Sequence, residues 1–154
     1  MEVSQPIEAL IRALEQSVEA GLTYLQGPGG QARIKVGIWG PREVLCHLVW
    51  WHQATVEGIE SVLAGGKPYR LYASVDEMNA RAVGRLADRD IAQLAELARQ
   101  LQARLVKAAR ALPDPNATVL VTGDGSGRSV LQRLETIARH WSEHVHALEA
   151  PSAA

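Results

Sequence analysis

The chain of 154 residues contains no phenylalanine and a single cysteine, Cys46. One cysteine cannot form an internal disulfide, which suits a reducing compartment. Acidic and basic side chains nearly balance, with a formal net charge of -1. No overall basic field therefore exists to collect nucleic acid or an anionic membrane, and we expect neither as a partner.

Long apolar runs are also missing, since none approaches the roughly 20 residues that a membrane span needs. The first ten residues, MEVSQPIEAL, lack the basic segment and apolar segment of a signal peptide. We therefore expect a cytoplasmic protein. With 47% hydrophobic and 21% charged residues, the composition is that of an ordinary globular chain. Its length predicts one domain, residues 1–154.

Helical periodicity recurs in four segments, and no substantial strand pattern accompanies them. Their approximate bounds are 6–25, 41–65, 74–112 and 129–148. The expected N-caps are Ser4, Gly40, Ser74 and, after a break in the third segment, Asp88 or Asp90. The pattern predicts an all-α protein, a four-helix bundle.

Residues 114–127 are expected to form a loop before the last helix. Within it, Thr118–Thr122 can pair briefly as a strand. Gly123–Gly127 is a flexible turn, and the Lys-Ser or Lys-Thr pair of a phosphate-binding loop does not follow it.

Histidine placement provides the main functional signal. His140 and His144 are four residues apart on a helix, so their side chains leave the same side, about 40° apart and one turn from each other. His47 lies at the edge of the core face of the second helix and can face them. Three imidazoles with one open position suit zinc, nickel or iron, although histidines at such positions can also be hydrogen-bonded without a metal. His146 should face solvent, and His52, about 140° from His47, cannot easily share the same ion.

Several segments together resemble one known superfamily. The stretch Trp39–Leu48, followed by Trp50–Trp51, resembles the DinB/YfiT-like pattern of a tryptophan, a helix start and then His-Leu. Val75–Arg81 is similar to a segment of the mycothiol-dependent maleylpyruvate isomerase N-terminal domain and of ClbS/DfsB proteins. His140–His144 matches the closing His-x-x-x-His of that superfamily. The likeness extends over roughly residues 5 to 149.

This resemblance implies a DinB/YfiT-like bundle of up-up-down-down type, often a homodimer, with a divalent metal, zinc or nickel, held by His47, His140 and His144. In such proteins the metal helps a low-molecular-weight thiol attack an electrophile, or activates water. The isomerase-type ligand set resembles His, Glu and His, and here the middle position is His140.

Four further residues have two possible roles each. Asn79 either lines a substrate pocket or makes a polar contact between helices. Trp51 and Trp141 either form walls of the metal pocket or pack in the core. Glu43, one turn before His47, either orients its imidazole or complements the helix dipole.

The expected function is that of a metal-dependent, thiol-dependent transferase or hydrolase acting on a small electrophilic substrate. The alternative is a non-catalytic protein that binds or sequesters a small molecule in a resistance or stress response. A third possibility is a structural dimer whose histidines are remnants.

Overall fold

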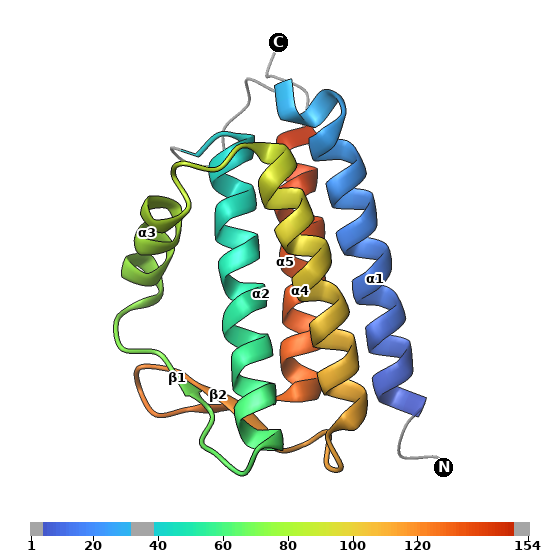
Figure 1. The fold of residues 1–154 in the computed structure, drawn as a ribbon, viewed down its shortest axis with the longest axis vertical. Coiled ribbons are helices and arrows are strands. Elements are labelled where there is room, and N and C mark those ends of the chain that lie inside the picture. Colours follow the sequence, from blue (N-terminus) through green and yellow to red (C-terminus); the bar gives the residue numbers. More distant parts are fainter. Residues whose placement is uncertain (1–4, 32–38, 150–154) are drawn as a thin grey trace.

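The computed structural model describes residues 5–31 and 39–149, so the expected cap Ser4 lies outside the described residues. Helices dominate this part of the chain, and a small three-stranded sheet lies at one end (Figure 1). The elements in chain order are α1 (Gln5–Gln26), the 3-10 helix η2 (Pro28–Gln31), α2 (Pro41–Leu63), β1 (Tyr69–Arg70), α3 (Val75–Arg85), α4 (Ile91–Ala111), β2 (Thr118–Val121), β3 (Gly127–Ser129) and α5 (Val130–Glu149).

The four long helices α1, α2, α4 and α5 lie side by side, and α3 stands on the outer side of α2 (Figure 1). α1 and α5 run in the same direction, and their C-terminal ends lie side by side, where the Tyr24 hydroxyl donates to the Leu148 carbonyl at 3.2 Å. α2 and α4 run in the other direction. The order is therefore up-down-down-up, and the up-up-down-down order implied by the resemblance is wrong. The physical reason is that η2, directly after α1, contacts both α1 and α2, so α2 begins near the end of α1.

Helix starts follow the capping residues in the sequence. At α2, the Gly40 N–H donates to the Glu43 carboxylate at 2.9 Å. At α3, the Ser74 hydroxyl accepts from the Glu77 N–H at 3.1 Å. These contacts satisfy backbone donors that have no partner inside the helix.

The third expected helical segment is two helices rather than one. Asp90 caps α4 by accepting from the Gln93 N–H at 2.8 Å, and the Gln93 side chain accepts from the Asp90 N–H in return. Of the two caps expected after the break, Asp90 is the one used. Because the chain turns between Arg85 and Ile91, α4 lies among the long helices and α3 does not.

Two hydrophobic clusters support the fold. The larger lies among the four long helices and buries the apolar stripe of each. The smaller joins α2 to α3 and the sheet, and its buried members are Trp50, Trp51, Ala54, Leu71, Met78, Ala82 and Leu120. α2 therefore belongs to both clusters, which explains why every residue from Val44 to His52 is buried.

The sheet confirms the expected short strand and adds two strands. β2 covers Thr118–Val121, pairs parallel to β1 and antiparallel to β3. Neither β1 nor β3 was predicted, because two or three residues carry no readable alternation. None of the described helices combines the length and apolar character needed to cross a membrane.

Candidate metal centre

His47, His140 and His144 meet between α2 and α5. His47 lies two turns into α2, and the other two lie one turn apart in the second half of α5. Because α2 and α5 run in opposite directions, these positions come to the same level. The ring centres are 4.9 Å apart for His47 and His144, 5.6 Å for His140 and His144, and 5.9 Å for His47 and His140. His146, on the same helix, is exposed, as its angular position predicts.

Two nitrogens of this cluster lack the hydrogen bonds that buried imidazoles normally make. His47 is only 4% exposed, and its Nδ1 atom is buried with no hydrogen-bond partner among the described residues. The same holds for Nδ1 of His140. Unpaired buried nitrogens are unfavourable in ordinary packing, and they are the atoms with which imidazole binds metals.

The environment keeps all three imidazoles uncharged. Burial lowers the pKa of His47 to about 3, and the neighbouring His144 and His140 add to the shift. Burial also lowers the pKa of His140, with a further contribution from His144, and it lowers the pKa of His144. Neutral imidazole is the form that binds a metal, so at neutral pH no proton has to be removed first.

The separations of the three rings can be compared with those of imidazoles that share one ion. Two imidazoles bound to one tetrahedral zinc ion at about 2.0–2.1 Å place their ring centres about 5 Å apart, close to the separations found here. In the described part of the chain, however, no group of three or more His, Cys, Asp or Glu side chains is arranged to hold an ion as it stands.

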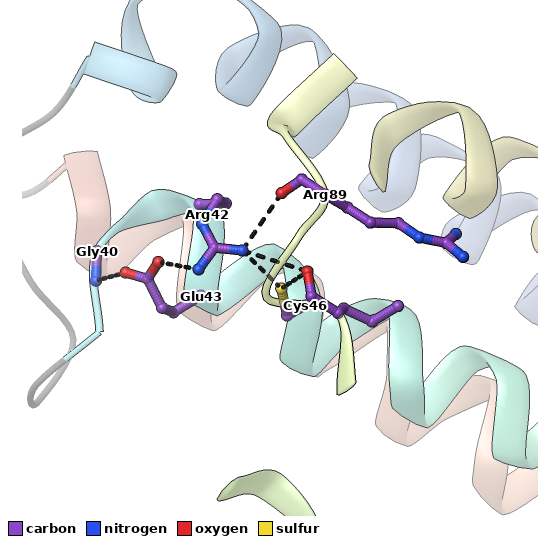
Figure 2. A network of polar contacts seen from close by, with 6 residues as sticks. Gly40, Arg42, Glu43, Cys46 and Arg89 are labelled. Atoms are coloured by element: carbon purple, nitrogen blue, oxygen red, sulfur yellow. Dashed lines mark hydrogen bonds and ion pairs between the residues drawn. The ribbon is translucent and has the colours of Figure 1, made fainter. Parts of the chain in front are cut away.

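A polar network one turn before His47 fixes the start of α2 (Figure 2). The Arg42 guanidinium donates to the backbone carbonyls of Leu86 and Arg89, each at 3.3 Å, and pairs with Glu43 at 3.0 Å. It also lies 3.7 Å from the sulfur of Cys46, a buried thiol whose pKa is raised by that burial. The network ties α2 to the turn between α3 and α4.

This network also decides between the two roles of Glu43. Its carboxylate accepts from the Gly40 N–H and pairs with Arg42, both at the helix start. Nδ1 of His47 has no partner among the described residues, and the contacts of the Glu43 carboxylate there do not include His47, so Glu43 does not orient the imidazole. Capping explains Glu43 fully.

Trp51 and Asn79 connect the neighbourhood of the cluster to α3. The indole N–H of Trp51 donates to the Asn79 side-chain oxygen at 2.7 Å. A side-chain contact with Asn79 also opposes the fall in the pKa of His47. Asn79 is thus an interhelical contact beside the cluster. Trp39, which the sequence did not single out as a site residue, packs on His47 with ring centres 5.2 Å apart.

Trp141 belongs to the core behind the cluster. It is completely buried, and a Cβ atom at Gly21 of α1 would come within 2.8 Å of its ring. Its indole N–H donates to Nδ1 of His52 at 3.3 Å. Because Nδ1 accepts, Nε2 carries the proton and donates to the Gln102 side-chain oxygen at 2.6 Å. Burial lowers the pKa of His52 to about 4, so this histidine is a neutral link between three helices.

Sequence reasoning missed Arg133 altogether. It lies on α5 seven residues before His140, which places it on the same helix face two turns earlier. Its side chain is buried. The spacing was the only available signal, since an isolated arginine on a helix is usually solvated.

Comparison with known proteins identifies one family. The model for the DinB superfamily matches residues 5–148, which is nearly the whole chain and includes all three histidines of the cluster. Searches among curated proteins and among solved structures find no match.

Proposed function

The chain belongs to the DinB superfamily, and we propose that it is a metal-dependent enzyme that holds one divalent ion, zinc or nickel, through His47, His140 and His144. The reaction proposed is a thiol-dependent transfer or a hydrolysis acting on a small electrophilic substrate. The observation that carries the proposal is the meeting of three neutral imidazoles, two of them with unpaired buried nitrogens.

The chemistry follows from what such an ion supplies. A divalent metal lowers the pKa of a bound thiol or water, which makes a nucleophile available at neutral pH. The chain's own contribution is to keep the three imidazoles deprotonated by burial. Trp39 and Trp51 supply apolar surface that excludes water near the cluster, and Asn79 holds Trp51 in place.

The architecture proposed for this function is the four-helix bundle of DinB/YfiT-like type, formed by α1, α2, α4 and α5, with residues 1–154 as one domain. We also propose a cytoplasmic homodimer that uses a low-molecular-weight thiol and binds neither nucleic acid nor membranes. Asn79 and Trp51 remain the proposed pocket residues, and Trp141 supports the pocket from the core behind it.

Metal content is the direct test. Untagged wild-type protein, His144→Ala and the matched control His146→Ala are supplemented with zinc or nickel, freed of loose ions and measured by elemental analysis. We expect about one ion per chain in the wild type and in the control, and none in His144→Ala. His146 is exposed on the same helix, so it tests for nonspecific loss.

Two results would count against the proposal. Wild-type protein that keeps no ion after supplementation lacks the site, and His144→Ala protein that keeps the ion places it elsewhere. Circular dichroism shows whether each variant is folded, and His47→Ala provides a second, independent removal of a ligand from α2. Turnover of 1-chloro-2,4-dinitrobenzene with 2-mercaptoethanol, followed with and without metal, tests the transfer reaction itself.

A second candidate function is binding or sequestering a small molecule without turnover. It needs no bound ion and uses the buried tryptophans and polar groups beside the histidine cluster. Saturable binding of the electrophile that is unchanged by a chelator, with no product formed, would favour this candidate over the enzyme.

A further inference from the structure

Arg133 is a buried arginine with an incomplete set of partners. It is 6% exposed, between α5 and α2. Its Nε donates to the Thr55 hydroxyl at 3.1 Å, and its guanidinium carbon lies 5.6 Å from the ring centre of Trp51. Nη2 is buried and has no hydrogen-bond partner among the described residues. A strong donor of fixed direction is therefore left over.

No carboxylate of the described residues pairs with this guanidinium. Six other arginines in that part of the chain each pair with a glutamate. Arg128, which lies near enough to affect Arg133, is another cation. Arg133 in turn lowers the pKa of His140, which favours the neutral imidazole. Burial, assisted by Arg128, lowers the pKa of Arg133 to about 10, which still leaves it charged at neutral pH.

A buried charge without a counter-ion is strongly unfavourable, and native proteins retain one where something else pairs with it. The Trp51 ring offsets part of the cost, because a guanidinium over an indole face is attracted to it. The ring and the Thr55 hydroxyl together still leave Nη2 unpaired. The missing partner is therefore a hydrogen-bond acceptor that carries a negative charge.

The position of Arg133 relates this missing partner to the histidine cluster. Seven residues of helix separate it from His140, which is about 10 Å along the same face of α5. On α2, Trp51 lies at a level between Arg133 and the histidine cluster, because it contacts Arg133 and comes one turn after His47. A small molecule with a charged end and a reactive end matches this distance.

We propose that Arg133 binds a carboxylate of the molecule on which the histidine cluster acts. The substrate class that follows is a small carboxylic acid, with its carboxylate on Arg133 and its reacting end at the imidazoles. The binding of a carboxylate by Arg133 does not depend on the proposed function, whereas the reaction at the imidazoles rests on it. The carboxylate comes from the electrophile or from the thiol, and the chemistry that recognises it is the same.

The test measures anion binding in the metal-free protein. Wild-type protein is titrated with sodium acetate against sodium chloride at constant ionic strength, and the change in melting temperature is followed together with the arginine Nε–H signals in ¹⁵N–¹H spectra. The variants are Arg133→Gln, Arg133→Lys and the control Arg139→Gln. Arg139 is an exposed arginine of the same helix, so its replacement removes the same charge.

We expect saturable acetate binding in wild type and Arg139→Gln, accompanied by a shift of the Arg133 signal. Binding should weaken about tenfold or more in Arg133→Gln, because a hydrogen bond to a charged group is lost. Arg133→Lys keeps the charge without the planar fork and should fall between the two. It also identifies the Arg133 signal if the glutamine variant does not fold. Equal binding in wild type and Arg133→Gln, or an Arg133 signal that acetate does not move, would overturn the proposal.

Two matched pairs of probes assign the carboxylate to its source. Acrylate is compared with acrylamide, and 3-mercaptopropionate with 2-mercaptoethanol, each by its binding to the metal-supplemented protein. Tighter Arg133-dependent binding of acrylate places the anion on the electrophile, and of 3-mercaptopropionate on the thiol. If neither charged probe exceeds its neutral partner, the proposal fails.

This outcome is separable from the metal proposal. Arg133→Gln should keep the metal content of the wild type, and His144→Ala should keep acetate binding. Loss of one property without the other identifies which proposal has failed.

Discussion

Replacing Gly58 by alanine should destabilise the protein, although a glycine inside a helix is usually a weak point. Gly58 lies in α2 where the helix passes β2. A Cβ atom there would overlap the carbonyl oxygen of Val119 and lie 3.1 Å from its carbonyl carbon. Val119 lies between Thr118 and Leu120, which both pair with β3, and Leu120 also pairs with β1, so its carbonyl cannot move far without disturbing the sheet.

The expected size follows from two opposed effects. Alanine improves helix propensity by about 1 kcal/mol over glycine. Overlap with a fixed backbone atom lies at the upper end of overpacking costs, about 3 kcal/mol. We therefore expect Gly58→Ala to lower the free energy of unfolding by about 2 kcal/mol.

Gly84 provides the matched control, since it lies in α3 with nothing within 4 Å of its would-be Cβ atom. Gly84→Ala should raise the free energy of unfolding by roughly 0.5–1 kcal/mol. Urea denaturation followed by circular dichroism measures both variants by linear extrapolation. Equal stabilisation by the two substitutions would refute the close approach of α2 to β2.

Three further outcomes follow from the same contacts. Burial lowers the pKa of His52 to about 4, so below about pH 6.5 the unfolded chain binds a proton that the folded chain does not, and the free energy of unfolding falls as pH drops. Between about pH 7 and about pH 5, His52→Gln should therefore lose about 2 kcal/mol less of its free energy of unfolding than wild type, as measured by urea denaturation. Trp51→Phe removes the donor to Asn79, and a double-mutant cycle with Asn79→Ala should give a coupling of about 1 kcal/mol; a coupling near zero would contradict the bond. Arg104→Ala breaks a half-exposed pair with Glu60 and should cost less than about 1 kcal/mol by the same assay, whereas a larger loss would mean that the pair is shielded from water.

The helices were predictable because local signals agreed with burial. Pro41 at the first position of α2 and the caps Ser74 and Asp90 mark helix starts that the structure uses. The sheet was harder, because the pairing of Tyr69 with Leu120 joins residues far apart in the chain. Such pairing depends on how the helices are arranged, which periodicity does not report.

The candidate site was predictable in part for the same reason. His140 and His144 share a helix face by spacing alone, and their meeting with His47 followed once α2 and α5 were opposed. The burial of Arg133 was not predictable, since it arises from Trp51 and Thr55 on another helix. The sequence left two roles open for Glu43, and the structure shows that its carboxylate contacts Gly40 and Arg42 at the helix start.

The peripheral position of α3 has a consequence for local unfolding. Among the helices, α3 packs chiefly against α2, and only Met78 and Ala82 of its eleven residues are buried. Regions with few buried contacts open at a lower free energy than the rest of the protein. Amide hydrogens of α3 should therefore exchange with solvent earlier than those of α4, and each opening would release the Trp51 indole from Asn79 without unfolding the four long helices.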